Sequence, residues 1–422
     1  MGNVLERKHL FGRLAQLVEH ALDVRRVSGS SPLSSTTIIR TIPLGTGSDF
    51  FCDNEVVPMS FNQALLTVMG FGALLGGADH LLGNRFGLGQ RFEEAFQLLG
   101  PLALSMSGII CLAPLISAGL SGVVVPLFQA LGLDPGMFGG ILPIDMGGYQ
   151  LAMDLAADPA VGRFSGIIVS ATFGCCLVFT IPVGLGMMRP EDRPWFTRGI
   201  LLGLLSLPFC LVLGGLACGL PILTTLYNVL PIVICCGLLL LGMRRWRDRI
   251  VGAFQCLSRW IQKIAILGLT LGAFLHLTGW ALPWELTSLT DAMEVACSIA
   301  IVMLGSMPLA ELLQKVMKVP FAWIRRRTGL NAASTTGLLV GAVSTVPGLA
   351  MFSRMDPRGQ VVNAAFLVCG ASTFAAHMGF AVTVEPEMVP SLLLAKLSGG
   401  TIGFLIALAA TRNMKNAPES VT

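Results

Sequence analysis

The chain has 422 residues, of which 54% are hydrophobic and 12% are charged, and its formal net charge is +4. A soluble domain carries roughly a quarter charged residues, so this composition excludes an ordinary soluble protein and favours a membrane protein. The 49 glycines and 23 prolines agree, because membrane helices tolerate both. The basic residues fall in short clusters between apolar runs, which excludes a nucleic-acid-binding stripe.

Residues 1–58 differ from the rest of the chain. They are basic and rich in Ser and Thr, and they contain no apolar run of the roughly 20 residues that a bilayer-spanning helix needs. The stretch 13–37 resembles the translation of a transfer-RNA gene, so we expect a natural start at Met59 and a non-native or disordered extension before it. A transit peptide is the alternative, whereas the pattern of a secretory signal is absent.

Nine apolar runs are long enough to form membrane-spanning helices. They lie at about 62–83, 99–120, 163–187, 198–219, 222–243, 258–280, 289–313, 358–384 and 388–411. Two further stretches, 134–157 and 332–355, are interrupted by Gly, Pro or hydroxyl residues, which predicts broken or re-entrant segments. The sequence therefore predicts an all-α polytopic membrane protein, with one transmembrane domain at 59–411 and a cytoplasmic tail at 412–422.

The basic residues also predict the orientation, since cytoplasmic loops are enriched in Lys and Arg. The loop 244–249 and the tract Lys315–Arg327 hold most of the positive charge and are assigned to the cytoplasm. The number of membrane crossings agrees with these assignments only if each interrupted segment returns to the side from which it enters. The first would enter from outside and the second from the cytoplasm. Eleven full spans are the alternative.

The two interrupted segments resemble each other in sequence. Residues 151–153 and Asp158-Pro159 match residues 349–351 and Asp356-Pro357, and the offset from 158 to 356 is 198 positions. Five predicted spans lie between the two segments, so re-entrant copies would have opposite orientations. This pattern predicts an inverted repeat with a substrate site where the broken helices meet, and chance similarity is the alternative. The repeat halves are expected at about 59–243 and 254–411.

Ionisable residues at membrane depth are costly to insert and therefore mark candidate functional sites. Asp145 is the first candidate, because it lies in the motif PIDMGGY, where Gly147 and Gly148 allow an unwound backbone with carbonyls free to face a ligand. A carboxylate beside such carbonyls suits a small cation. Capping of the second half-helix by Asp145 is the alternative.

Other polar residues in or near the spans extend the candidate site, and most of them have a structural alternative. His377 could donate to a substrate or relay a proton, or it could be a packed, hydrogen-bonded histidine. Solvation at the membrane interface is the alternative for Asp79 and Glu94, and a bond between helices is the alternative for Asn363. Glu294 lies early in the seventh span. Because nucleotide-binding, hydrolase and metal-ligand motifs are absent from the sequence, we expect no enzyme, no metal and no cofactor.

Several motifs together resemble the EutH family of bacterial ethanolamine permeases. They are GQRFEEAFQLLGPLALSMSGIICLAP (89–114), GMFGGILPIDMGGYQLAMDLA (136–156), FTIPVGLGMMRPEDR (179–193), AMEVACSIAIVMLGSMP (292–308) and FSRMDPRGQVVNAAF (352–366). The resemblance covers nearly everything after Met59. It implies a multi-pass protein of the bacterial inner membrane that imports ethanolamine and has no catalytic activity.

The resemblance also implies where ethanolamine, a small protonated amino alcohol, would bind. Asp145 would pair with the ammonium group, carbonyls at Gly147 and Gly148 would accept from the hydroxyl group, and Tyr149 would offer a ring face. The expected substrate-binding residues are Asp79, Glu94, Asp145, Met146, Gly147, Gly148, Tyr149, Glu294, Asn363 and His377.

Two departures from the family pattern leave the substrate open. Residues 375–380 read AAHMGF where the family tends to read GDHLGF, and residues 344–347 read STVP where it tends to read NNIP. Both changes remove strong polar groups, so a different small amine or cation is the alternative substrate. A membrane-embedded scaffold or sensor and an enzyme acting on lipid head groups are alternatives from other classes. Ion coupling and homo-oligomerisation are not decided by the sequence.

Overall fold

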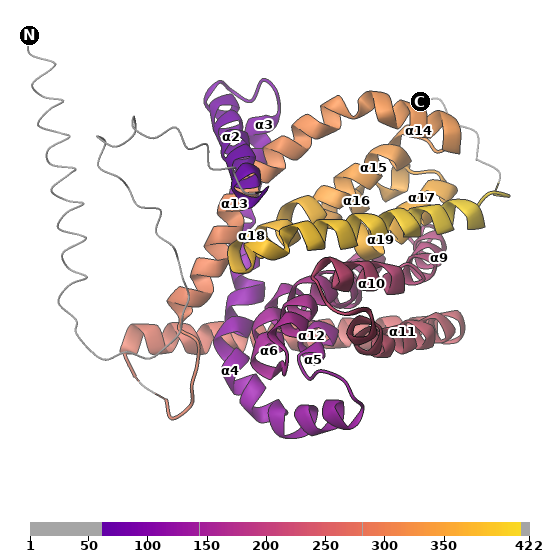
Figure 1. Ribbon diagram of the computed structural model, residues 1–422. Coiled ribbons are helices and arrows are strands. Elements are labelled where there is room, and N and C mark those ends of the chain that lie inside the picture. Colours follow the sequence, from indigo (N-terminus) through magenta and orange to yellow (C-terminus); the bar gives the residue numbers. More distant parts are fainter. Residues whose placement is uncertain (1–60, 143, 281, 415–422) are drawn as a thin grey trace, which may run out of the picture. The chain divides into compact units, whose positions relative to one another are not determined.

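The computed structural model describes residues 61–142, 144–280 and 282–414. The predicted extension at 1–58 and the predicted start at Met59 lie outside these residues, as does the tail after 414. The described residues form helices and connecting turns, and none of them lies in a strand (Figure 1). The prediction of an all-α polytopic membrane protein is confirmed.

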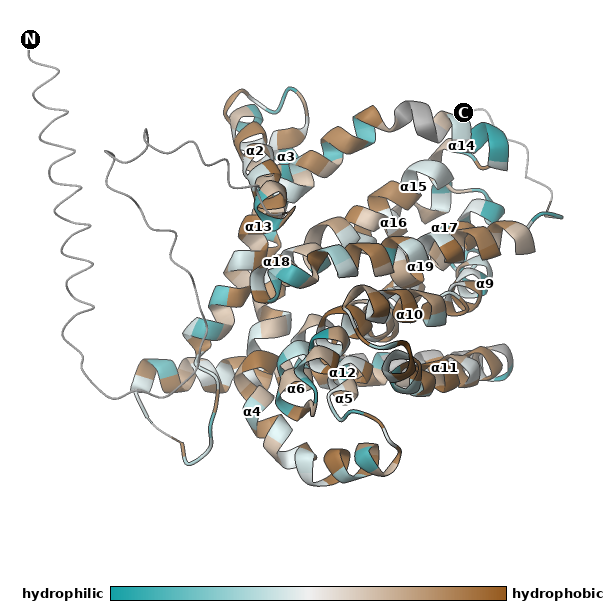
Figure 2. Cartoon of the chain, in the orientation of Figure 1, coloured by the Kyte–Doolittle hydropathy of each residue, from teal (hydrophilic) through white to brown (hydrophobic). Residues whose placement is uncertain are grey.

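Eight helices are long and apolar enough to cross a membrane, and a bent pair brings the number to nine within the described residues. The pair is α9 (Arg193–Leu204) and α10 (Leu207–Ala217), bent by 42°. The others are α2 (Phe61–Leu81), α3 (Leu88–Gln97) with α4 (Leu99–Ala130), the run Pro159–Met187, α11 (Ile222–Arg245), α12 (Arg247–Thr278), α13 (Leu289–Val316), the run Pro357–Val384 and α19 (Val389–Ala410). The nine predicted runs are therefore found. Figure 2 shows that most of these helices are apolar along their length.

The second of these helices is longer than the predicted span. It runs over Leu88–Ala130, whereas hydropathy predicted 99–120. The added first part is α3, whose sequence LGQRFEEAFQ alternates charged and apolar residues along a helix and so lacks a continuous apolar signal.

Both predicted interruptions are real breaks in helices. The first segment consists of α5 (Met137–Ile141), the 3₁₀ turn η2 (Asp145–Gly147) and α6 (Gly148–Leu155). The second consists of α15 (Ala332–Val343), α16 (Thr345–Ala350) and the 3₁₀ turn η5 (Phe352–Arg354). In each, the two arms approach too closely for a side chain. A Cβ atom on Gly148 would lie 2.3 Å from the Gly139 carbonyl oxygen, and one on Gly348 would lie 2.8 Å from the Gly341 Cα atom.

Hydrogen bonds join the two ends of each interrupted segment. The Asp134 carboxylate accepts from the backbone nitrogens of Ala157 and Asp158, at 3.2 and 2.8 Å. The Asn331 backbone nitrogen donates to the Asp356 carboxylate at 3.1 Å. A segment that starts and ends at the same place is a hairpin, so the structure favours two re-entrant segments over eleven full spans. We refer to 134–158 and 331–356 as the first and second hairpins.

The two halves share an order of elements that supports the predicted repeat. After each hairpin an aspartate caps a helix that has proline at its first position, namely Asp158 before α7 (Pro159–Arg163) and Asp356 before α17 (Pro357–Gly370). Each of these helices then continues through π-helical turns, η3 (Phe164–Gly174) and η4 (Cys176–Thr180) in the first half and η6 (Thr373–His377) in the second. The inversion of one half relative to the other stays a prediction.

The helices after the two hairpins form the centre of the bundle. α17 packs against α9 and α19, α19 packs against α10, and η3 packs against the first hairpin. Their contacts are filled by large apolar side chains such as Phe164, Phe173 and Phe196, all of which are buried. The hairpins therefore lie against tightly packed helices.

Candidate functional site

The turn of the first hairpin contains the motif that the sequence singled out. Asp145 opens η2, and the next three residues, Met146, Gly147 and Gly148, are buried. The turn packs against α4, because a Cβ atom on Gly147 would lie 3.1 Å from the side chain of Ile109. It also packs against the π-helix η3. The residues 145–148 predicted to bind substrate are thus held at a helix break inside the bundle.

Tyr149 connects this turn to the other half of the protein. Its hydroxyl group donates to the Glu385 carboxylate at 2.8 Å. Its ring meets the ring of Phe380 edge to face, with centroids 5.9 Å apart. Phe380 lies on α18 (Met378–Val384), and Glu385 directly follows that helix. A carboxylate, a phenol and two rings gathered in one place are groups that can bind an ammonium ion.

Glu385 was not among the predicted site residues. In the sequence it stands in a loop that has acidic residues and no Lys or Arg, and such a loop is predicted to lie outside. The sequence signal that could have indicated a functional role is an acidic residue directly after the span that contains His377. The sequence could not show that Tyr149, 236 positions away, is its partner.

The break of the second hairpin lies beside another break in the helix that follows. Ser344 separates α15 from α16. The hydroxyl groups of Thr345 and Ser372 lie 2.8 Å apart, and either of them can donate the hydrogen bond. Ser372 has a left-handed backbone, with φ of 51°, and its nitrogen donates to the Gly341 carbonyl at 3.0 Å. Thr345 and the Gly341 carbonyl therefore hold the two breaks together.

His377 belongs to the same region. It is buried at the end of η6, and its Nδ1 atom lies 3.1 Å from the carbonyl oxygen of Ala371, the residue before the break at Ser372. The structure thus places His377 close to the second hairpin. Its interaction with a substrate stays a prediction.

Asp79 and Glu94 lie in a different part of the protein. The buried Asp79 carboxylate accepts from the backbone nitrogens of Phe86, Leu88 and Gly89, at 2.8 to 3.0 Å, and so fixes the start of α3. Glu94 pairs with Arg91 at 2.7 Å. The geometry gives both residues a structural role in the packing of α3.

The structure does not gather the predicted acidic residues into one site. Arg91 also pairs with Glu311 of α13 at 3.0 Å, which places Glu94 beside Glu311. Glu294 is exposed on the same helix, 17 residues before Glu311, and a helix rises about 1.5 Å per residue, so roughly 25 Å separates them. Glu94 and Glu294 cannot contact one small substrate at the same time.

Asn363 joins a helix to a hairpin. It is buried in α17, and its Nδ2 atom donates to the carbonyl oxygens of Ser334, at 2.8 Å, and Gly359, at 2.9 Å. This is the bond between helices that the sequence allowed as the alternative. As for metal sites, the described part of the chain contains no group of three His, Cys, Asp or Glu residues that could hold an ion.

A helical membrane domain with broken, re-entrant hairpins has the architecture of a secondary transporter. The chain belongs to the EutH family, because the family described as "Ethanolamine utilisation protein, EutH" matches residues 61–410. This match includes both hairpins and every helix named above.

Relatives cover almost the same length. The chain is 37% identical to the uncharacterized protein YxeR of Bacillus subtilis (strain 168), over 81% of this chain and 93% of that protein. It is 34% identical to the probable ethanolamine permease EutH of Listeria monocytogenes, over 85% and 96%. It is 31% identical to the probable ethanolamine permease EutH of Escherichia coli (strain K12), over 83% and 95%. No solved structure gives a significant match.

Proposed function

We propose that this protein is a permease of the bacterial inner membrane that imports ethanolamine and has no enzymatic activity. The observation that carries the proposal is the family match over residues 61–410, because relatives of nearly equal length in that family are named probable ethanolamine permeases. The architecture supports it, since the two hairpins provide helix breaks inside an apolar bundle. Such breaks expose backbone groups that can bind a polar solute.

The proposed site uses the turn of the first hairpin for the charged end of the substrate. Ethanolamine is a cation at neutral pH, and a carboxylate at Asp145 would be its counter-ion. The ring of Tyr149 and the carboxylate of Glu385 offer a second point of attraction at the predicted outer side. The hydroxyl groups of Thr345 and Ser372, with His377, are suited to the hydroxyl end of the substrate. Asp79, Glu94, Glu294 and Asn363 are the less supported members of the predicted set.

Uptake of labelled ethanolamine into proteoliposomes tests the proposal. The wild-type protein should carry ethanolamine faster than protein-free liposomes, and Asp145→Asn should reduce this uptake to the protein-free level, because the neutral amide loses the charge attraction. Asp154→Asn is a matched control on the same hairpin, since Asp154 is exposed and accepts a bond from Gln150. Full uptake by Asp145→Asn, in protein that elutes normally in gel filtration, would contradict the role of Asp145.

A different small amine as substrate is the alternative favoured by the changes at 344–347 and 375–380. Competition distinguishes the two. Excess unlabelled ethanolamine should inhibit uptake more strongly than ethylamine, which has the same charge without the hydroxyl group. Stronger inhibition by ethylamine would show that the protein recognises an alkylamine instead.

A further inference from the structure

The side chain of Tyr149 lies beside the turn of the first hairpin that carries the proposed cation site. Tyr149 follows Gly148 at the start of α6 and is half-buried. A Cβ atom on Gly166 of η3 would lie 2.8 Å from the Tyr149 Cδ2 atom, and the ring centroid lies 5.9 Å from that of Phe380 on α18. The ring of Tyr149 is therefore placed where the two halves of the protein meet, next to the turn η2.

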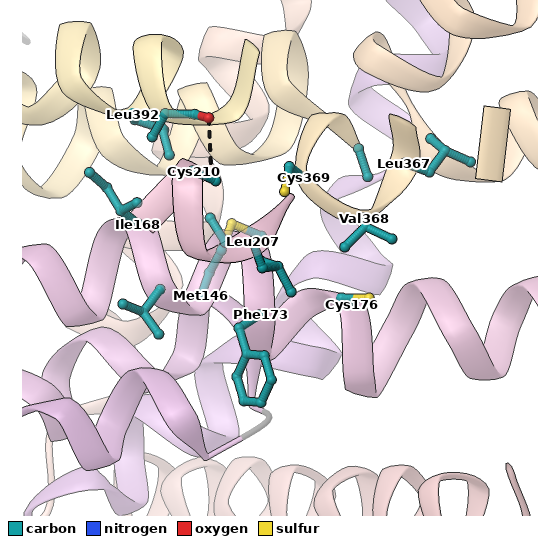
Figure 3. Packing of buried hydrophobic residues seen from close by; sticks show 14 of the residues in the cluster. Met146, Ile168, Phe173, Cys176, Leu207, Cys210, Leu367, Val368, Cys369 and Leu392 are labelled. Atoms are coloured by element: carbon teal, nitrogen blue, oxygen red, sulfur yellow. Dashed lines mark hydrogen bonds between the residues drawn. The ribbon is translucent and has the colours of Figure 1, made fainter. Parts of the chain in front are cut away.

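The backbone that carries this ring is fixed by packing. Met146 belongs to the buried apolar cluster shown in Figure 3, together with Ile168 of η3. A Cβ atom on Gly148 would also lie 2.3 Å from the Gly139 carbonyl oxygen. Such close packing leaves little room for the backbone to move. The part of this contact that can change is therefore the Tyr149 side chain and its hydrogen bond.

That hydrogen bond ends on a carboxylate at the predicted outer end of α18. The Tyr149 hydroxyl group donates to Glu385 at 2.8 Å, and Glu385 is half-buried. The loop that contains Glu385 has no Lys or Arg and is predicted to lie outside. Loss of a donor from a half-buried carboxylate is costly unless another donor takes its place. Tyr149 therefore stays on Glu385 until a new donor arrives.

We propose that Tyr149 and Glu385 form a selectivity gate that admits only ammonium ions with an N–H group, a role that rests on the proposed function. The ammonium group of the substrate replaces the Tyr149 hydroxyl group as the donor to Glu385. The freed ring turns away from α18, and the cation passes to the turn of Asp145. A quaternary ammonium ion has the same charge but no N–H group, so it cannot replace the phenol.

The two hydrogen bonds that exchange at Glu385 differ in strength. The phenol of Tyr149 is a neutral donor, whereas an ammonium N–H group and a carboxylate pair as two full charges, which makes their bond stronger. The rings of Tyr149 and Phe380 attract any cation, with or without an N–H group. Charge and ring faces alone would therefore admit both kinds of ion. The hydrogen bond discriminates, because a site that bonds to an N–H group rejects the analogue that lacks it.

Competition in intact cells tests the proposal, because intact cells present only the outer face of the protein. Cells without ethanolamine uptake of their own express the full-length protein and receive labelled ethanolamine together with an unlabelled competitor. The competitors are ethylamine, N-methylethylamine, N,N-dimethylethylamine and ethyltrimethylammonium. They have no hydroxyl group, so the ammonium N–H is the only donor of the first three, and the last has no donor.

Each competitor is larger than the one before it by one methyl group, which separates the effect of size from the effect of the donor. With the wild-type protein, inhibition should weaken gradually over the first three and then by at least about tenfold at ethyltrimethylammonium, because the bond to the carboxylate is lost. With Tyr149→Phe, the last step should be about as small as the earlier ones, because no phenol has to be replaced. Tyr227→Phe is the matched control and should keep the wild-type pattern, since Tyr227 is the other tyrosine of the chain and is exposed on α11.

The outcomes separate this inference from the proposed function. Equal steps through the whole series in the wild-type protein would show that size selects the substrate, which would overturn the gate and leave the permease intact. A large last step that persists in Tyr149→Phe would also overturn it, as would a lack of inhibition by every competitor. Absence of ethanolamine uptake by the wild-type protein would overturn both proposals. The wild-type series decides even if Tyr149→Phe fails to fold.

Discussion

The hydroxyl group of Tyr149 donates to the Glu385 carboxylate at 2.8 Å, and this bond joins the first hairpin to the end of α18. A bond to a carboxylate contributes about 1.5–3 kcal/mol. We therefore expect Tyr149→Phe and Glu385→Gln each to lower the melting temperature of the purified protein. The double variant should lose no more than the worse single variant, because the two side chains share one interaction. Melting curves of the four proteins provide the test.

The phenylalanine keeps the edge-to-face contact with Phe380, so its effect isolates the lost hydrogen bond. Glu387→Gln is the control, since Glu387 lies two residues away and is exposed. Losses that add up in the double variant would show that Tyr149 and Glu385 stabilise the protein independently.

The hydrogen bonds that join the two ends of each hairpin lead to a prediction about the membrane topology. Because Asp134 binds the backbone of Asp158, and Asp356 binds that of Asn331, both ends of a hairpin must lie on one side of the membrane. The distribution of basic residues places the first pair of ends outside and the second pair in the cytoplasm.

Labelling of single cysteines in intact cells tests this topology. The exposed positions are Ala130, before the first hairpin, and Ala157, at its end, together with Arg327, before the second hairpin, and Ser353, near its end. In a Cys256→Ser background, which removes an exposed native cysteine, a membrane-impermeant maleimide should label Ala130→Cys and Ala157→Cys but not Arg327→Cys or Ser353→Cys. All four should react after permeabilisation. Labelling of only one member of a pair would show that the segment crosses the membrane.

We expect substitution of Asp79 to affect folding and not transport, in contrast to Asp145, although both residues were predicted to bind substrate. The Asp79 carboxylate accepts from three backbone nitrogens at the start of α3, so Asp79→Ala leaves two buried donors and one partly buried donor without this acceptor. Loss of such a cap costs about 2 kcal/mol or more. We expect less folded protein in the membrane and unchanged uptake per folded molecule, measured by gel filtration and ethanolamine transport.

Glu93→Gln is the control for this substitution, because Glu93 is exposed on the same helix and bonds only locally to Gln97 among the contacts described. If Asp79→Ala folds in normal amounts and transports nothing, Asp79 acts on the substrate and not on α3.

The spans and the hairpin breaks were predictable because their causes are local. Twenty apolar residues identify a membrane helix, and the glycines at 147 and 148 mark a place where a helix opens. The sequence likeness of Asp158-Pro159 and Asp356-Pro357 also had a local structural counterpart, since each pair begins a capped helix after a hairpin. The start of the second span was missed because α3 is amphipathic.

The partners of the polar residues were not predictable, because they depend on packing between distant segments. Asp79 carries the same charge as Asp145, but the turn at 82–87, with Gly87 in a left-handed conformation, brings three backbone donors to it. Lys396 is one charge in an otherwise apolar run, and the sequence does not show that it donates to the distant carbonyl of Ala171. The type of such a residue suggests a role, whereas its neighbours in the fold decide that role.

Ser165 and Asn363 lie at equivalent positions of the two halves, 198 positions apart, and both tie a hairpin to the helix after it. The Ser165 hydroxyl group accepts from the Gly140 nitrogen at 3.1 Å, and Asn363 donates to the Ser334 carbonyl at 2.8 Å. We expect Ser165→Ala and Asn363→Ala each to lower the stability by about 1–3 kcal/mol, because a buried group loses its partner. Uptake per folded molecule should fall little in either. A selective loss of uptake in Asn363→Ala, in stable protein and without a similar loss in Ser165→Ala, would instead assign Asn363 to the substrate.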